Sequence, residues 1–200
     1  GVPEDTPLLL DVGAWVPWKK HELYLEALAA VRRHIPDAMG LLVGSDLFQE
    51  NQAYGAQLEK LTRRLRLAEG ALLLLQQRDD IPDLMAAADV LVAPSENEPF
   101  GRVLVEAGAA QLPVAATDSG AKREIVVDGQ TGFLTAPGDA GALAEACVKL
   151  LADPGLRRAM GERGCSRATE LFDVRRTARQ MADLYHELLV AHRMPPTRRK

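Results

Sequence analysis

Two glutamates on either side of a Pro-Phe-Gly turn are the residues of this sequence best placed to do chemistry. Because Pro and Gly disfavour a helix interior, we expect Glu98 in a loop and a helix that begins near Arg102. Glu106 then lies in the early turns of that helix. The free N–H groups and the dipole at a helix N-terminus attract a phosphate, and neighbouring carboxylates suit the hydroxyls of a sugar or ribose. The pattern predicts a site for a phosphorylated sugar or nucleotide.

A simpler interpretation of both acids stays open at this point. An acidic residue before a helix is often only a cap, and Glu106 could be a solvated residue on the helix surface. The elements that position the two side chains decide between these interpretations.

Short apolar segments alternate with segments of helical periodicity along the chain. We expect strands at 8–13, 40–44, 71–75, 90–93, 113–116 and 132–134. We expect helices at 21–34, 54–67, 81–88, from 102, at 139–152, at 156–171 and from 172 to about 190. Strands that are apolar throughout and joined by helices predict a parallel sheet covered on both faces. The fold class is therefore α/β, a Rossmann-like doubly wound sheet of about six strands with C-terminal helices.

In such a sheet, ligands bind beyond the carboxyl ends of the strands. The loops that begin there start at Gly13, Gly44, Gln76, Pro94 and Thr117. Glu98 lies in one of these loops, so the fold and the motif point to the same place.

Composition excludes several classes of protein. The 200 residues carry a formal net charge of −4, which argues against bulk nucleic-acid binding. Cys147 and Cys165 lie in helical surroundings, so we expect buried free thiols and not a metal site. No apolar run approaches the length of a membrane span, so we expect neither a transmembrane segment nor a signal peptide. The sequence begins at Gly1 without Met, which we interpret as a fragment or a processed chain.

The segment from Glu98 to Glu106 resembles the Glu-x7-Glu element of retaining glycosyltransferases of the GT-B fold, in the large family 4 group (glycosyl transferases group 1). The resemblance covers almost the whole chain. It is carried by an ordered set of segments, at 89–95, 98–106, 112–120, 124–126, 128–134, 137–139 and 150–154.

The resemblance implies the C-terminal, donor-binding half of a two-domain enzyme. Residues 1–171 would form the domain that binds a nucleotide-diphosphate sugar, 172–192 a helix that crosses to the missing N-terminal acceptor domain, and 193–200 a frayed tail. We expect the fragment to bind nucleotide, to show no transfer without its other half, and to self-associate through exposed apolar surface.

The resemblance also implies roles for individual residues. Glu98 would face the donor sugar, and Lys19 would neutralise the diphosphate leaving group; these two are the catalytic candidates. Glu106 would hold the ribose hydroxyls, and the loop with Arg78 would meet the base through main-chain groups. The remaining donor-binding candidates are Gly13, Phe100, Gly101, Arg102, Val103, Lys20 and Lys122.

The sequence departs from the family pattern at two places. Ala14 stands where the family usually has an arginine after the first glycine, and Ala121 replaces a frequent second glycine. Because one ammonium holds a diphosphate poorly, we hypothesise that Lys20, Lys122 or Arg102 supplies the lost charge. The alternative for the two lysines is a solvated surface position.

Four further side chains have two interpretations each. Trp15 and Trp18 could line the sugar side of the cleft or anchor their loop. His21 could open the following helix or take part in catalysis, and Glu124 could cap a short helix or contact the donor.

The resemblance implies transfer with retention to an acceptor hydroxyl on a glycan, lipid or small molecule. It implies no cofactor besides the UDP- or GDP-sugar substrate and no bound metal; the sequence has no Asp-x-Asp motif. We expect a cytoplasmic location, with peripheral attachment to the inner face of the membrane as an option through the missing half. A degenerate, non-catalytic module for a nucleotide sugar or glycan is the alternative, and an epimerase or phosphorylase of the same fold is a third.

Overall fold

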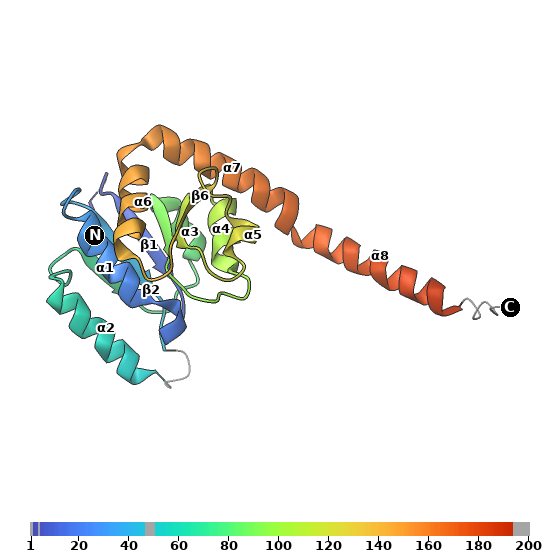
Figure 1. Cartoon of the computed structure of the whole chain (residues 1–200), viewed down its shortest axis with the longest axis horizontal. Helices are drawn as coiled ribbons and strands as arrows, with labels where there is room; N and C mark the ends of the chain where they lie inside the picture. Colours follow the sequence, from blue (N-terminus) through green and yellow to red (C-terminus); the bar gives the residue numbers. More distant parts are fainter. Residues whose placement is uncertain (1, 4, 47–50, 194–200) are drawn as a thin grey trace.

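A computed structural model describes the chain except for residues 1, 4, 47–50 and 194–200. Its centre is a six-stranded sheet in which every neighbouring pair of strands is parallel (Figure 1). The strands are β1 (Leu8–Val12), β2 (Met39–Val43), β3 (Leu72–Leu75), β4 (Val90–Ala93), β5 (Val114–Thr117) and β6 (Gly132–Thr135). Their order in the sheet is β3-β2-β1-β4-β5-β6. The predicted doubly wound parallel sheet is confirmed.

Helices connect these strands and cover both faces of the sheet (Figure 1). They are η1 (Pro17–Lys19), α1 (His21–Val31), α2 (Gln52–Arg64), α3 (Ile81–Ala87), α4 (Arg102–Ala109), α5 (Lys122–Ile125), α6 (Ala140–Ala152), α7 (Pro154–Phe172) and α8 (Val174–Arg193). Asp139 caps α6, since its side chain accepts a hydrogen bond of 2.8 Å from the Ala142 N–H.

The chain breaks between α6 and α7 as expected, but the break is Asp153 alone and not residues 153–155. Pro154 and Gly155 form the first turn of α7, and the Asp153 side chain accepts a 2.9 Å hydrogen bond from the Leu156 N–H. Proline is tolerated there because the N–H it lacks has no partner within a helix. Phe172 ends α7 and does not begin the last helix, while Arg193 belongs to α8; the rest of the predicted tail lies outside the described residues.

The strands are apolar throughout because both of their faces are buried. In β1, Leu9 packs into the cluster under α1 and α6, whereas Leu10 packs into the cluster under α4. Val90 and Leu91 divide between the same two clusters. This alternation within a continuous apolar run is what a sheet covered on both sides requires. Cys147 is buried as predicted, but Cys165 is only partly buried.

The order of the strands reverses beside β1, which has β2 on one side and β4 on the other. Successive crossovers leave this point in opposite directions and open a crevice at the carboxyl ends of the two central strands. The segment 13–20 after β1 and the segment 94–101 after β4 therefore face each other across the crevice.

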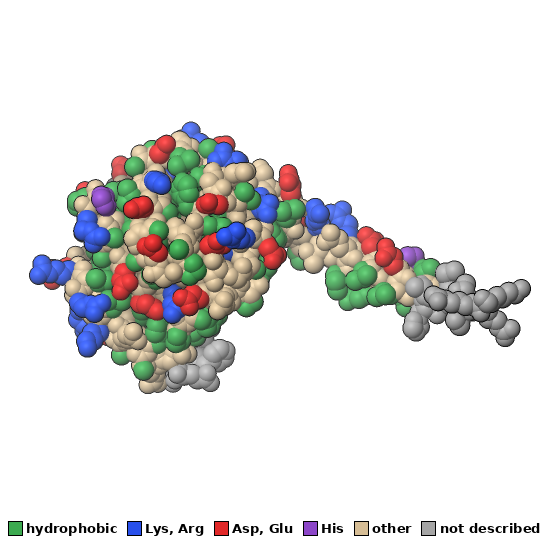
Figure 2. Space-filling view, viewed as in Figure 1, with side chains coloured by type: hydrophobic (Ala, Val, Ile, Leu, Met, Phe, Trp, Pro, Cys, Tyr) green, Lys and Arg blue, Asp and Glu red, His purple; other side chains and the backbone are tan. Residues whose placement is uncertain are grey.

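The last helix, α8, projects away from the rest of the chain (Figure 1). Its hydrophobic side chains gather on an uncovered surface (Figure 2), and Leu188 and Leu189 are 57% and 61% exposed. No helix of the described part of the chain has both the length and the apolar character needed to cross a membrane.

Candidate functional site

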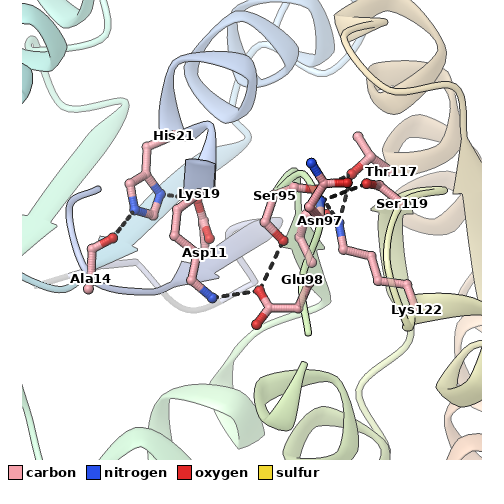
Figure 3. A network of polar contacts seen from close by, with 11 residues as sticks. Asp11, Ala14, Lys19, His21, Ser95, Asn97, Glu98, Thr117, Ser119 and Lys122 are labelled. Atoms are coloured by element: carbon pink, nitrogen blue, oxygen red, sulfur yellow. Dashed lines mark hydrogen bonds and ion pairs between the residues drawn. The ribbon is translucent and has the colours of Figure 1, made fainter. Parts of the chain in front are cut away.

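An ion pair joins the two loops that face each other at the sheet crevice. Lys19 Nζ lies 2.7 Å from Glu98 Oε2, and the two side chains are 17% and 11% exposed (Figure 3). The Ser95 hydroxyl donates a 3.2 Å hydrogen bond to the same carboxylate oxygen. Glu98 lies in a loop as predicted and makes no capping hydrogen bond to α4, so the simple capping interpretation is wrong.

Local backbone geometry brings Lys19 to this position. Lys20 has a left-handed conformation with φ of 56°, which separates η1 from α1 and turns the chain after Lys19. Gly13 leaves room for the side chains that cross it, because a Cβ there would lie 3.3 Å from Lys19 Cδ and 3.4 Å from His21 Cε1. The Lys19 ammonium also lies 4.5 Å from the centroid of the Trp18 ring.

The loop between β5 and α5 holds the backbone at Asn97 and Glu98 through hydrogen bonds. The Ser119 hydroxyl accepts a 2.7 Å hydrogen bond from the Asn97 N–H, and Glu98 O accepts one of 3.0 Å from the Ala121 N–H. At Gly120, φ is 63° and a Cβ would lie only 2.3 Å from Glu98 O. This position therefore requires glycine. Sequence reasoning missed Ser119 and Gly120, although the Ser-Gly pair at the end of a strand was a signal for a tight turn.

Lys122 is completely buried beneath the same loop. Its ammonium donates to Ala93 O at 3.0 Å, to Ser95 O at 2.5 Å and to Thr117 Oγ1 at 2.7 Å (Figure 3). The surface alternative for Lys122 is wrong. So is its hypothesised direct contact with a diphosphate, because all three N–H groups point at protein oxygens.

Lys20 lies at the surface and shares its charge between two acids. Its Nζ is 3.6 Å from Glu96 Oε2 and 3.9 Å from Glu22 Oε1, with the side chain 32% exposed. The structure therefore leaves Lys20 near the crevice but already paired.

The N-terminus of α4 opens beside a cavity of about 530 Å³. Gly101, with φ of 92°, precedes the helix, and the first N–H groups of α4 have no partner within it. Arg102 Nε lies 3.2 Å from Glu106 Oε1 at the cavity wall. The cavity is lined by Val12, Ile81, Pro82, Met85, Arg102, Glu106, Ala109 and Ala110. Its volume is in the range that accommodates a small-molecule ligand of nucleotide size.

Of the predicted site residues, Arg102 and Glu106 line this cavity, whereas Lys19, Glu98, Gly101, Val103 and Lys122 line a smaller one beside it. Arg78 and Phe100 line neither of them. The exposed Arg78 guanidinium pairs with Asp80 through two hydrogen bonds, one of 2.6 Å from Nε to Oδ1. That hydrogen bond is the main reason that the pKa of Asp80 falls below its usual value. Phe100 is 44% exposed and packs edge-on against Phe172, with 5.8 Å between the ring centroids. The cavity begins instead at Ile81, just after the loop that contains Arg78.

The aromatic side chains after β1 differ in their surroundings. Trp15 packs against the core cluster under α1, which favours the anchoring interpretation, whereas Trp18 is 42% exposed near Lys19. Glu124 is exposed at α5, which shows no side-chain capping hydrogen bond.

A second buried ion pair lies behind the segment 13–20. His21 Nδ1 is 2.7 Å from Asp11 Oδ2, and His21 Nε2 is 3.0 Å from Ala14 O. Burial alone would lower the pKa of His21, but the Asp11 carboxylate outweighs it and raises the pKa above 6.5. His21 is fully buried, so it anchors the segment and does not face a ligand. Sequence reasoning missed Asp11, whose signal was a lone acid in an apolar strand.

Among the residues that the structure describes, no group of three or more His, Cys, Asp or Glu side chains is arranged to hold a metal ion.

Comparisons with known proteins place this geometry in a family. Residues 1–167 match the family model described as Glycosyl transferases group 1. The chain is 35% identical over 206 residues to D-inositol 3-phosphate glycosyltransferase of Streptomyces avermitilis, covering 96% of this chain and 42% of that protein. It is 30% identical over 189 residues to N-acetyl-alpha-D-glucosaminyl L-malate synthase of Bacillus anthracis, covering 94% of this chain and 48% of that protein.

A solved structure shows the same similarity in three dimensions. The crystal structure of Anabaena Alr3699/HepE in complex with UDP-glucose superposes with a TM-score of 0.86 at 34% identity, covering 92% of this chain and 49% of that one. The chain thus spans about half of the length of the relatives it matches.

Proposed function

The chain belongs to the glycosyl transferases group 1 family, and on this premise we propose that it is the donor-binding half of a glycosyltransferase. Such an enzyme moves a sugar from a nucleotide diphosphate to an acceptor hydroxyl. The UDP-glucose complex of the Anabaena relative supports a nucleotide sugar as the donor.

The observation that carries the proposal is the Lys19–Glu98 ion pair at the sheet crevice, next to the N-terminus of α4. We place the diphosphate against the first amides of α4, from Gly101 to Val103, with Lys19 as its cation. The sugar then faces Glu98, and the ribose hydroxyls face Glu106.

We place the base against the apolar part of the cavity, where Ile81, Pro82 and Met85 form the wall. Main-chain groups just before Ile81 would then hydrogen-bond the base. Because these contacts are apolar or through main chain, UDP- and GDP-sugars both remain candidates.

The chemistry that this arrangement supports is cleavage of the bond from the anomeric carbon to the diphosphate oxygen, while the acceptor oxygen forms a new bond to that carbon and its proton passes to the departing diphosphate. Negative charge develops on the leaving diphosphate. Preorganised amides and the Lys19 ammonium stabilise it, an effect worth about 3 kcal/mol for one donor in comparable sites. We propose that transfer retains configuration and proceeds without a bound metal, in the synthesis of a glycan or a glycosylated lipid or small molecule.

The missing half of the enzyme would supply the acceptor site. The relatives are about twice as long, and the exposed apolar face of α8 is a surface that an N-terminal domain can cover. We assign peripheral attachment to a membrane surface to that domain.

Binding of donors by this chain tests the proposal. In a thermal-shift and calorimetric panel of UDP, GDP and ADP with their sugars, one series should raise the unfolding temperature, because a ligand at a hundred times its Kd stabilises the folded state by about 2.7 kcal/mol. Glu106→Ala should abolish the shift, while Glu124→Ala, at an exposed position on α5, should keep it. Absence of any shift across the panel would refute the proposal.

A non-catalytic binding module is the second candidate, and Ala14 at the usual arginine position is the observation that favours it. The two candidates separate when the chain is joined to its N-terminal half. Turnover that Glu98→Gln abolishes supports the enzyme, whereas donor binding without turnover supports the module.

A further inference from the structure

The neighbours of the buried Lys122 side chain determine its protonation state. The hydroxyl hydrogen of Thr117 is donated to Ser95 O over 2.7 Å, so Thr117 Oγ1 can only accept from Lys122. The carbonyl oxygens of Ala93 and Ser95 have no hydrogen to give. All three contacts therefore require hydrogens from Lys122, and only the charged form has three.

The charge of Lys122 reaches Glu98 through one intervening residue. Ser95 accepts from Lys122 with its carbonyl oxygen and donates to Glu98 Oε2 with its hydroxyl, 3.2 Å away. Lys122, Glu98 and Lys19 also line the same small cavity. Figure 3 shows Lys19 and Lys122 on opposite sides of Glu98.

The charges around Lys122 come from four segments. They are Glu98 and Glu96 in the loop after β4, Lys19 in η1, Asp11 in β1 and Asp118 after β5. Burial lowers the pKa of Lys122 to about 8, and the largest effect that raises this pKa is the attraction of the Glu98 charge. At neutral pH the ammonium form therefore prevails, in agreement with the three hydrogen bonds.

The Lys19 ammonium cannot keep its ion pair with Glu98 and also neutralise a diphosphate. Its ammonium is engaged with Glu98 at 2.7 Å, and under the proposed function a diphosphate draws it away. Glu98, whose side chain is only 11% exposed, would then lose its partner, and an uncompensated buried carboxylate is strongly unfavourable. Lys122 cannot move toward the ligand, because three hydrogen bonds hold its ammonium at the ends of β4 and β5.

We propose that Lys122 is a positioning residue for Glu98. Lys122 compensates the negative charge of Glu98, from the side opposite Lys19, when Lys19 turns to the diphosphate. The proposal rests on the proposed function. It assigns no ligand contact to Lys122, which acts through Ser95 and through its fixed charge.

A ligand-linked titration of Lys122 tests the proposal on the intact chain. The probe is the nucleoside diphosphate that the panel selects among UDP, GDP and ADP. Lysine labelled with ¹³C at Cε reports each ammonium separately, and Lys122→Arg, which removes the lysine signal but keeps the positive charge, identifies the Lys122 signal. If the diphosphate prefers charged Lys122 about tenfold, saturating ligand must raise the Lys122 midpoint by about one pH unit, because the coupling is reciprocal. A residue that only supports the fold would titrate with the same midpoint in both states.

Variants give a second readout. Lys122→Met should weaken diphosphate binding about tenfold at pH 7, and Lys60→Met, at an exposed position on α2, should leave it unchanged. Ser95→Ala removes the hydroxyl link to Glu98 but keeps the carbonyl that Lys122 binds, so it should reduce the midpoint shift.

The outcomes separate the two proposals. Binding with an unchanged Lys122 midpoint overturns the role of Lys122 alone, and so does a folded Lys122→Met chain with wild-type affinity. If Lys122→Met does not fold, the wild-type titration decides. No binding of any of the three diphosphates overturns the proposed function and this inference with it.

Discussion

Replacing Gly120 by alanine would test whether the β5–α5 loop fixes the backbone of Glu98. The new Cβ would lie 2.3 Å from Glu98 O and 2.6 Å from Glu98 N, and contacts under 3.0 Å force a movement. Both atoms belong to the backbone, so no side-chain rotation relieves the clash. The Glu98 carbonyl must move by roughly 0.7 Å to reach 3.0 Å.

The cost has two parts that a matched control separates. Alanine in the left-handed conformation costs about 1–2 kcal/mol, and overpacking costs about 1–3 kcal/mol more. Gly129 has φ of 69°, and a Cβ added there would meet no atom within 4 Å, so Gly129→Ala incurs only the first part. We therefore expect Gly120→Ala to lower the free energy of unfolding by about 1–3 kcal/mol more than Gly129→Ala does.

The assay is urea unfolding of both variants at 25 °C, followed by calorimetric titration with the selected diphosphate. Gly120→Ala should weaken binding on the order of tenfold, because it displaces Glu98 beside the ligand. Gly129→Ala should bind like wild type. Equal destabilisation by the two substitutions, or wild-type affinity in Gly120→Ala, would show that the loop does not position Glu98.

Three further predictions concern separate parts of the chain. Lys19→Met should weaken diphosphate binding about tenfold or more but change nucleoside binding little, as measured by calorimetry, and equal losses for both ligands would contradict a phosphate contact. The Asp11–His21 pair raises the pKa of His21, so its stabilisation is present below pH 6.5 and is lost as pH rises through the higher folded-state value. Urea midpoints between pH 6 and 7.5 should therefore fall in wild type, and an equal slope in Asp11→Asn would exclude this origin. Leu184→Glu with Leu188→Glu, at positions 47% and 57% exposed, should change the free energy of unfolding by less than about 1 kcal/mol while reducing self-association in light scattering, and strong destabilisation would mean that α8 packs on the domain.

The sequence predicts the loop position of Glu98 because two strong signals coincide there, whereas Lys19 was found only through the resemblance to the family. The apolar runs define parallel strands, and parallel strands bring their carboxyl ends to one edge whatever their separation along the chain. Pro99 and Gly101 then keep Glu98 out of a helix. The helix and strand boundaries differ from prediction by no more than three residues.

Burial of single polar residues is where sequence reasoning failed. Lys122 stands beside Arg123 and Glu124, both exposed, so the local pattern is that of a surface turn. Its burial depends on the carbonyl oxygens of Ala93 and Ser95 and on the hydroxyl of Thr117. Of these three acceptors, only the Thr117 hydroxyl is a side-chain group that the sequence displays. The requirement for glycine at position 120 likewise comes from a backbone 22 positions away, as the Asn97–Ser119 hydrogen bond shows, and not from its neighbours.

The balance of charge at the crevice explains why a cation that touches no ligand can matter. Ala14 offers no guanidinium, and its carbonyl is occupied by His21. If Lys19 and Glu98 were the only charges considered, their sum would be zero. A diphosphate that binds Lys19 would then only replace the Glu98 carboxylate as the partner of Lys19. Lys122 adds a positive charge that the ligand cannot displace. The site therefore keeps a favourable electrostatic interaction with the diphosphate after Lys19 moves from Glu98 to the ligand. The low-dielectric surroundings of Lys122 keep its charge from being screened.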